Sequence, residues 1–255
     1  MAEIEVGGIP VWNEQITGDK IPGSTRIPVV EISEFFDGKT EGLSGLDLGS
    51  GQGRSTRVLE NYLVGSKITA LDLSFSGLRL TQTQDKVQAK AEELPFKTNS
   101  FDFINVCGVM TNIVDENPMV AREMRAKVLS NLYLAVKPGG CIVISDFGAQ
   151  HLMDTYQVNY DRHLLITGEK GTIAVLKNGE NFVGKSDEEV AAMKGTSAIE
   201  RYAHHYTPAE LMDLIKNAGF DLRKYSVETV QTPVGNKTIE NIIMLAEKPH
   251  ERIEI

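Results

Sequence analysis

A strand that runs into three alternating glycines constrains this chain more than any other feature. Residues 46–54 read LDLGSGQGR, so an apolar strand leads into Gly49, Gly51 and Gly53 and then into a helix. Glycine is needed where the backbone turns sharply and where a ligand must approach it closely. The free N–H groups at the start of the following helix attract an anionic group. Such a loop can hold a dinucleotide pyrophosphate or the carboxylate of a cofactor that carries an amino acid.

Two acidic residues, Asp47 and Asp72, stand beside this loop in the expected fold. Dinucleotide sites typically use G-x-G-x-x-G, whereas the glycines here alternate with single residues. An acid ahead of the loop is useful when the ligand carries an ammonium group. Asp72 ends the second expected strand, where a carboxylate can accept hydrogen bonds from both ribose hydroxyls of either cofactor. Its alternative role is to cap a helix that starts at Ser74. The spacing favours a cofactor with an amino-acid portion, although Asp72 alone does not discriminate.

Strand-like and helix-like patterns alternate from residue 44 to residue 147. Such alternation needs crossover connections, which predicts an α/β fold with a mostly parallel, doubly wound sheet of the Rossmann-like type. The KPGG stretch at 137–140 closes the last long helix, because proline cannot continue it and glycine permits the turn. Strands are expected at 46–48, 67–73, 101–107 and 141–147, and helices at 55–63, 77–84 and 119–136.

The pattern changes after residue 147. Residues 148–206 are rich in aromatic and polar residues, which indicates an inserted cap over the end of the sheet, and the Asn-Gly pair at 178–179 predicts a tight hairpin turn in it. Thr207 and Pro208 then start a helix. Segments 220–229 and 238–247 should pair as an antiparallel hairpin. The chain therefore divides into an N-terminal lid or helical segment (1–43), a cofactor-binding core (44–147), the substrate cap (148–206) and a C-terminal helix and β-hairpin that complete the core (207–255).

Composition limits which cellular compartment and which binding partners we expect for this chain. The 255 residues carry a net charge of -9 and show no dense basic block for binding phosphates, so nucleic acid is a disfavoured partner. No apolar run approaches the length of a membrane helix, and the N-terminus lacks the features of a signal peptide, so we expect a cytoplasmic protein without a membrane partner. Cys107 and Cys141 lie in apolar runs without Cys-x-x-Cys spacing, which predicts small buried side chains and no metal site.

Four sequence blocks, in order, carry a resemblance to a known family. They are LDLGSGQGR from Leu46, ALDLS from Ala70, AEELPFKTNSFDFINV from Ala91 and LAVKPGGCIVISD from Leu134. With the closing HHYTPAELMDLIKNAGF from His204, the chain resembles the class I S-adenosylmethionine-dependent methyltransferases. The likeness is closest to the broad group that includes ubiquinone and menaquinone C-methyltransferases. The resemblance implies a seven-stranded Rossmann-like sheet and S-adenosyl-L-methionine as the cofactor.

The resemblance also implies where the cofactor binds. The glycine loop would bind the methionine end of S-adenosylmethionine. Asp47 would face its ammonium group through water, and Asp72 would bind the ribose hydroxyls. Two positions depart from many relatives: Lys90 replaces an acid that accepts the adenine amino group, and Thr111-Asn112 replaces a His-His pair. Ala91 and Glu92 fall at the adenine, and Cys107 and Gly108 fall beside the methionine portion. The implied cofactor-binding residues are Asp47, Gly49, Ser50, Gly51, Gly53, Asp72, Leu73, Ala91, Glu92, Cys107 and Gly108.

Methyl transfer from a sulfonium mainly needs alignment and exclusion of water, so no particular catalytic residue is obligatory. The acceptor should lie over the carboxyl ends of the strands, beneath the cap and the N-terminal segment, where Trp12 is either a lid residue or an anchor. A histidine there can act as a general base, and structural packing is the alternative for each candidate. The polar candidates are His151, Tyr156, Tyr160, His163, Tyr202, His204 and His205, of which Tyr160, His163 and His204 are singled out as catalytic candidates.

Three classes of function compete on these observations. The leading class is an S-adenosylmethionine-dependent methyltransferase acting on a small-molecule acceptor at O, N, S or C. The second methylates a protein, a peptide or RNA. The third binds a cofactor on a Rossmann-type fold without transferring a group, or is an NAD-linked oxidoreductase, against which the glycine spacing and the terminal hairpin argue. The sequence indicates neither the acceptor nor the oligomeric state.

Overall fold

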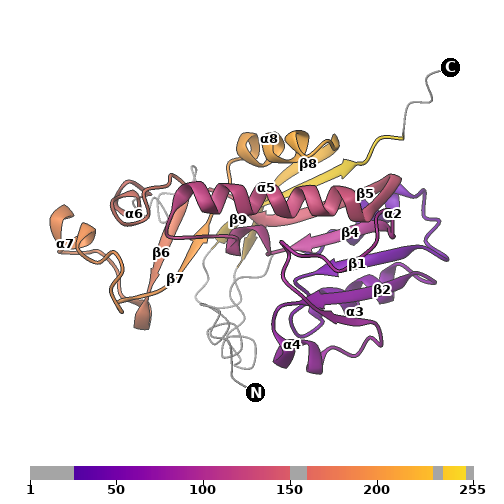
Figure 1. The fold of residues 1–255 in the computed structure, drawn as a ribbon, viewed down its shortest axis with the longest axis horizontal. Coiled ribbons are helices and arrows are strands. Elements are labelled where there is room, and N and C mark those ends of the chain that lie inside the picture. Colours follow the sequence, from indigo (N-terminus) through magenta and orange to yellow (C-terminus); the bar gives the residue numbers. More distant parts are fainter. Residues whose placement is uncertain (1–25, 150–159, 232–237, 251–255) are drawn as a thin grey trace.

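The computed structural model describes residues 26–149, 160–231 and 238–250, and it shows a seven-stranded sheet with helices on both faces (Figure 1). The strand order is β3-β2-β1-β4-β5-β9-β8. Strands β1 to β5 run parallel, whereas β9 pairs antiparallel with both β5 and β8. The predicted fold class is confirmed. The strands are β1 (Ser44–Leu48), β2 (Lys67–Asp72), β3 (Lys86–Gln88), β4 (Phe101–Cys107), β5 (Val136–Phe147), β8 (Asp221–Gln231) and β9 (Thr238–Glu247).

Helices cover the sheet in two layers (Figure 1). Helices α5 (Pro118–Ala135) and α8 (Pro208–Asn217) pack on one face, and α2 (Val29–Phe35) and α3 (Arg54–Tyr62) pack on the other. Helix α4 (Phe75–Leu80) follows β2. Among the residues that the structure describes, no helix is long and apolar enough to cross a membrane.

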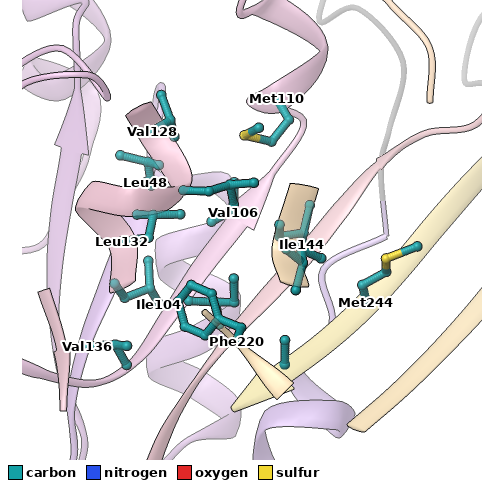
Figure 2. Close-up of a cluster of buried hydrophobic side chains, with 14 of the residues drawn as sticks. Leu48, Ile104, Val106, Met110, Val128, Leu132, Val136, Ile144, Phe220 and Met244 are labelled. Carbon is teal, nitrogen blue, oxygen red and sulfur yellow. The ribbon is translucent and has the colours of Figure 1, made fainter. Parts of the chain in front are cut away.

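The central strands are buried on both faces. Figure 2 shows Val128 and Leu132 of α5 against Ile104 and Val106 of β4 and Ile144 of β5, all of them fully buried. Burying an aliphatic side chain of this size stabilises the fold by roughly 1.5–3 kcal/mol. Because both faces are covered, β4 and β5 read as continuous apolar runs, as strands of parallel sheets do.

Polar side chains cap the N-termini of α5 and α8. The side chain of Asn117 accepts a hydrogen bond from Met119 N at 3.0 Å, and Pro118 follows as the first residue of α5. Thr207 accepts from Glu210 N at 3.2 Å ahead of α8. Each cap satisfies a backbone donor that the helix itself leaves free. The predicted Thr207 cap is confirmed.

A second, two-stranded sheet lies beyond the carboxyl edge, within the predicted cap (Figure 1). It is formed by β6 (Thr172–Leu176) and the antiparallel β7 (Ile199–His204), with α6 (Tyr160–Thr167) and α7 (Asp187–Ala191) beside it. This unit has its own apolar core, made of Ile166, Ala174, Leu176, Phe182 and Val190.

The predicted tight hairpin at residues 178–179 is wrong. Strand β6 ends at Leu176, and a single 3-10 turn, η2 (Lys177–Gly179), follows it with Asn178 in the left-handed region at φ 57°. The next segment is helical because Ser186 accepts from Glu189 N and Glu189 bonds back to Ser186 N, which makes a capping box for α7. The partner strand β7 therefore arrives only after that helix.

The boundaries of one helix and one strand also differ from those expected. The helix expected at 77–84 is α4, which starts earlier because the side chain of Ser74 accepts from Gly77 N at 3.1 Å, and stops where Thr81 becomes extended. The strand expected to begin at 141 begins at Val136, which pairs with Phe101. Trp12 and the first 25 residues, with His151 and Tyr156, lie outside the described residues.

Candidate functional site

The glycine loop after β1 is bonded to the neighbouring strand. Backbone N–H groups of Gly49 and Ser50 both donate to Leu71 O, at 2.7 and 3.0 Å. Gly49, Gly51 and Gly53 all have positive φ, at 69°, 53° and 79°, a region that only glycine enters without strain. The alternating glycines are therefore required by the backbone path itself.

Asp72 at the end of β2 reaches across to this loop. Its Oδ2 accepts from Gly51 N at 2.8 Å, and its Oδ1 accepts from Ser74 N at 2.7 Å. Burial raises the pKa of Asp72, and the backbone hydrogen bonds oppose that shift. Each carboxylate oxygen keeps a further lone pair for a ligand hydroxyl. Ser74, not Asp72, caps α4.

The loop leaves room for a ligand at one point. A Cβ placed on Gly51 would meet nothing within 4 Å, whereas one on Gly53 would lie 2.6 Å from Thr81 Cγ2. The hydroxyl of Ser50 is buried and has no hydrogen-bond partner among the described residues. An open backbone, an orphaned hydroxyl and an adjacent carboxylate together fit a cofactor with an amino-acid end and a ribose, such as S-adenosylmethionine.

Asp47 lies under the loop and is fully buried. Its Oδ2 accepts from Ser55 Oγ at 2.7 Å and Thr56 Oγ1 at 2.6 Å, and its Oδ1 accepts from Asn105 Nδ2 at 2.8 Å. Burial raises the pKa of Asp47, and these three donors oppose the shift. The carboxylate thus ties β1, β4 and the first turn of α3 together, and its predicted contact with an ammonium group stays a prediction.

The segment expected at the adenine follows β3. Asn131 Nδ2 of α5 donates to Glu92 O at 2.7 Å, and Gln88 Nε2 donates to Leu73 O at 3.1 Å. Ala91 packs against the core on the α5 face. These contacts tie Leu73 to β3 and Glu92 to α5, and the expected contact of this segment with adenine stays a prediction.

At the end of β4 the chain turns through Gly108, whose φ is 68°. Gly108 N donates to Ser145 O at 2.8 Å, and Asn112 Nδ2 donates to Gly108 O at 2.8 Å. Asn112, one of the two departures from relatives, thus stabilises this turn. The thiol of Cys107 contacts Arg26 O at 3.7 Å. The structure therefore brings Cys107 and Gly108 to the same edge as the glycine loop.

A cleft of about 320 Å³ lies between the cap and the core at this edge. Tyr160 OH lies 2.8 Å from His205 Nδ1, and the ring of His205 lies 6.0 Å from that of Phe147. Burial lowers the pKa of His205 to about 3, so its imidazole is neutral at pH 7. The cleft is lined by Arg122, Ala149, Tyr160, Lys170, Gly171, His205, Thr207 and Glu210.

The three catalytic candidates occupy different surroundings. Tyr160 lines the cleft. His163 lies inside the cap, where its Nδ1 accepts from Ala174 N at 3.1 Å and its ring packs on Phe182. His204 is fully buried between Thr172, 2.7 Å from Nδ1, and Glu210, 2.9 Å from Nε2. The geometry gives His163 and His204 structural partners, and their catalytic roles remain predictions. No cluster of metal-ligating side chains occurs in the described parts of the chain.

A buried ion pair that sequence reasoning missed joins the cap to the core. The guanidinium of Arg125 in α5 contacts the carboxylate of Glu169, and both side chains are almost fully buried. Thr172 Oγ1 also donates to Glu169, at 2.7 Å. A polar residue inside an apolar strand was an available signal for the partner of Asp47, because Asn105 stands in FDFINVC.

Comparisons with known proteins agree with this geometry. A methyltransferase domain family matches residues 46–144. The chain is 27% identical over 195 residues to the ubiquinone/menaquinone biosynthesis C-methyltransferase UbiE of Vibrio campbellii, covering 71% of this chain and 65% of that protein. It is 32% identical over 122 residues to the UbiE protein of Shewanella piezotolerans, covering 43% of this chain and 45% of that one. The chain thus spans about half to two thirds of the length of these relatives.

Solved structures share the fold. A SAM-dependent methyltransferase from Methanosarcina mazei has a TM-score of 0.71 at 22% identity, covering 89% of this chain and 100% of that one. The 1,6-didemethyltoxoflavin-N1-methyltransferase of Burkholderia thailandensis, solved with its namesake ligand and S-adenosylhomocysteine, has a TM-score of 0.54 at 17% identity, covering 87% of this chain and 76% of that one. Residues 46–144 thus form a methyltransferase domain within the fold of S-adenosylmethionine-dependent methyltransferases, and the chain is similar to the ubiquinone and menaquinone C-methyltransferases.

Proposed function

We propose that this protein transfers a methyl group from S-adenosyl-L-methionine to a small-molecule acceptor. The observation that carries the proposal is the loop at Gly51, which is open to a ligand while its N–H is held by Asp72. Gly49, Ser50 and Gly51 would bind the methionine end, and Asp72 would bind the ribose hydroxyls. A dinucleotide would instead call for the G-x-G-x-x-G spacing that this loop lacks.

When bound, the cofactor would supply a methyl group that its sulfonium activates. The methyl group leaves without the bonding electron pair, so the sulfur becomes a neutral thioether. The residues of the chain have to align the acceptor and exclude water. Gly108 at the end of β4 and the cleft at the end of β5 lie on neighbouring strands, because β4 pairs with β5. We therefore expect an acceptor in the cleft to lie near the methionine end of the cofactor site.

The cleft suits a small acceptor. Its volume of about 320 Å³ falls at the lower end of pockets that hold small ligands. Tyr160 and neutral His205 form a hydrogen-bonded pair on its wall, so they can orient an acceptor hydroxyl or receive a proton from it through His205. The low pKa makes His205 a weak base, and this suits an acceptor that needs orientation more than deprotonation.

A macromolecular acceptor is the second candidate. The net charge of -9 opposes binding of RNA phosphates, while a peptide side chain would fit the same cleft. The relatives named for ubiquinone and menaquinone biosynthesis support a small acceptor for this chain. Its cytoplasmic location and the division into a lid, core, cap and C-terminal hairpin remain our proposals from the sequence.

Calorimetry with S-adenosylmethionine, S-adenosylhomocysteine and NAD tests the cofactor. We expect saturable heat from the first two and none from NAD, and the reverse pattern would defeat the proposal. A methyl-labelled cofactor incubated with a metabolite extract tests the transfer. Label should appear in a small molecule and not in protein or RNA.

Tyr160→Phe tests whether the cleft holds the acceptor. It removes the hydroxyl that pairs with His205 and keeps the ring. We expect turnover to fall while the free energy of binding S-adenosylhomocysteine stays within about 0.5 kcal/mol of the wild-type value. Tyr160 lines the cleft, and no residue of the glycine loop does. Leu165→Met, an exposed substitution in the same helix α6, is the matched control. Equal losses of turnover and cofactor affinity in Tyr160→Phe would contradict the assignment.

A further inference from the structure

The main sheet ends in two strands of very different length. Strand β3 forms one edge with three residues, and β8 forms the other with eleven. An edge strand presents a row of unpaired N–H and C=O groups, and proteins commonly keep such strands short or cover them. Among the described residues, β8 pairs with β9 alone. Within these parts of the chain, the outer edge of β8 is thus left open to a further strand.

Side chains of β8 alternate between the two faces of the sheet. The β9 partners of Tyr225 and Val227 belong to the core beneath α5 and α8, so these two side chains share that face. Tyr225 is nevertheless 53% exposed and Val227 is 46% exposed. One aromatic and one β-branched side chain thus stand half in solvent on this face of the edge strand.

The opposite face of β8 carries charges of both signs. Lys224 Nζ lies 3.1 Å from Glu34 Oε2 of α2, and both side chains are more than half exposed. Arg26 Nη2 donates to Glu228 Oε1 at 3.1 Å, and the Glu228 side chain stays 36% exposed. Lys224 and Glu228 therefore both keep surface for a partner outside the chain. The strand as a whole has two positive and two negative charges, so it is neutral in a chain of net charge -9.

A twofold axis through the middle of β8 gives a self-complementary register. The middle residue is Ser226, so an antiparallel copy of the strand centred there pairs all eleven residues. Lys224 then lies opposite the partner's Glu228 on one face. On the other face, Tyr225 lies opposite the partner's Val227. The symmetry repeats both pairs, and pairs of opposite charge or of an aromatic with a β-branched residue stabilise antiparallel strands.

Registers shifted by one or two residues lose this match. In a continuous sheet, side chains that lie opposite each other point to the same face, so the twofold axis has to pass through a residue. An axis through Lys224 or through Glu228 would place that charge opposite itself. An axis through Tyr225 or through Val227 would place Lys224 and Glu228 opposite uncharged residues. The axis through Ser226 therefore combines the longest pairing with matched charges.

We propose that this chain forms a twofold-symmetric dimer in which the β8 strands of two copies pair antiparallel about Ser226 and join the two sheets. This inference goes beyond the proposed function and does not depend on it. The neutral strand lets two acidic chains approach each other at a place where their charges match. The glycine loop after β1 lies on the far side of β4, β5 and β9 from this edge, so each copy keeps its own cofactor site.

Sedimentation velocity over a range of concentrations measures the association of the wild type. An interface made mainly by one strand is small, so we expect 28.1 kDa monomers to dimerise with a Kd between roughly 1 µM and 1 mM. Val227→Lys should raise this Kd at least tenfold, because it sets a charge against the partner's Tyr225. Val183→Lys, the same change at an exposed residue of the cap, is the matched control and should dimerise as the wild type does.

Charge reversal tests the register. In Lys224→Glu alone and in Glu228→Lys alone, like charges face each other across the axis, so each variant should be monomeric where the wild type is dimeric. When the two variants are mixed, two acidic side chains of one copy face two basic side chains of the other, and mixed dimers should form. Energy transfer between two fluorophores, one on each variant, detects these dimers. Circular dichroism melts check folding, because each change also removes an ion pair with Glu34 or Arg26.

The outcomes are distinct. A wild type that stays monomeric up to about 1 mM overturns the inference, and so does a dimer that Val227→Lys leaves intact. A mixture of the two folded charge variants that stays monomeric overturns the register about Ser226 and the proposal with it. Calorimetry with S-adenosylhomocysteine reports separately on the proposed function, and we expect equal Kd values for the wild type and Val227→Lys. A dimeric wild type that fails to bind S-adenosylhomocysteine would defeat the proposed function and leave the dimer in place.

Discussion

The carboxylate of Asp72 accepts a hydrogen bond from the backbone N–H of Gly51 at 2.8 Å, so the acid that ends β2 positions the loop that follows β1. A second bond, from Ser74 N at 2.7 Å, orients the other oxygen. Both oxygens are thus held in place before any ligand arrives. In this arrangement one side chain organises the backbone that would bind the methionine end and presents the lone pairs that would bind the ribose.

Replacing Asp72 should weaken cofactor binding more than it destabilises the fold. We expect Asp72→Ala to reduce the affinity for S-adenosylhomocysteine by about 1.5–3 kcal/mol, the range for hydrogen bonds to a charged group. Asp72→Asn should lose less, since its amide oxygen can still accept from Gly51 or Ser74. Calorimetry gives the affinities, and a circular dichroism melt checks folding. An unchanged Kd in folded Asp72→Ala would remove Asp72 from the site.

A methyl group at Gly51 should block the cofactor while the fold survives. Gly51→Ala places its Cβ in open space at φ 53°. The only expected loss of stability is therefore that of the left-handed backbone, about 1–2 kcal/mol. Gly38→Ala is the matched control, because Gly38 has φ 72°, also with nothing within 4 Å. Both variants should lose similar stability in urea, and only Gly51→Ala should lose binding of S-adenosylhomocysteine. Equal affinities would place the ligand elsewhere.

The ion pair between Arg125 and Glu169 should stabilise the junction of cap and core. Burial alone would raise the pKa of Glu169, but hydrogen bonds from Thr172 and Arg125 outweigh it and the pKa lies below its usual value. Arg125→Met leaves a buried carboxylate, so we expect a loss of about 3–5 kcal/mol in the free energy of unfolding.

The double variant Arg125→Met/Glu169→Gln provides the internal control for this pair. It removes both charges, so its loss should be smaller than the sum of the two single losses. Urea unfolding followed by circular dichroism measures all three. Additive losses would mean that Arg125 and Glu169 act independently.

Acid should weaken the cap through His163. Burial lowers the pKa of His163 to about 4 from an ordinary 6.5, so the folded state holds this imidazole neutral. Between pH 6.5 and pH 4 the unfolded chain binds the proton and the folded chain does not. The stability that the neutral side chain contributes is therefore present above pH 6.5 and is lost as the pH falls toward 4.

His163→Gln keeps an acceptor for Ala174 N and does not titrate. Its free energy of unfolding should fall less than that of the wild type between pH 6.5 and pH 4, by about 1–3 kcal/mol. Urea unfolding at several pH values measures the difference. Parallel pH profiles for the two proteins would show that His163 is not the titrating group.

Much of the core could be predicted from local sequence. The apolar runs FDFINVC and CIVISDF have to be buried on both faces, and the three glycines have to follow a strand, because each signal depends on neighbours in the chain. The helix that starts at Thr207 and Pro208 was predictable for the same reason, since a cap acts within one turn. The hairpin expected at Asn178 failed because Asn-Gly permits a left-handed turn without requiring the next segment to be a strand.

The sequence by itself determined the strand–glycine–helix loop, the alternation that makes a parallel sheet, and the acid at the end of β2. Only the tertiary structure decided which polar side chains found partners. Asp47 meets Asn105 from another strand, and Arg125 meets Glu169 from the cap, whereas Ser145 and Asn241 meet none among the described residues. Hydrogen bonds between residues far apart in the chain depend on sheet register and on helix packing, which no local pattern encodes. For that reason the glycine loop and Asp72 could be predicted from the sequence, whereas the partners of the buried polar side chains became known only from the fold.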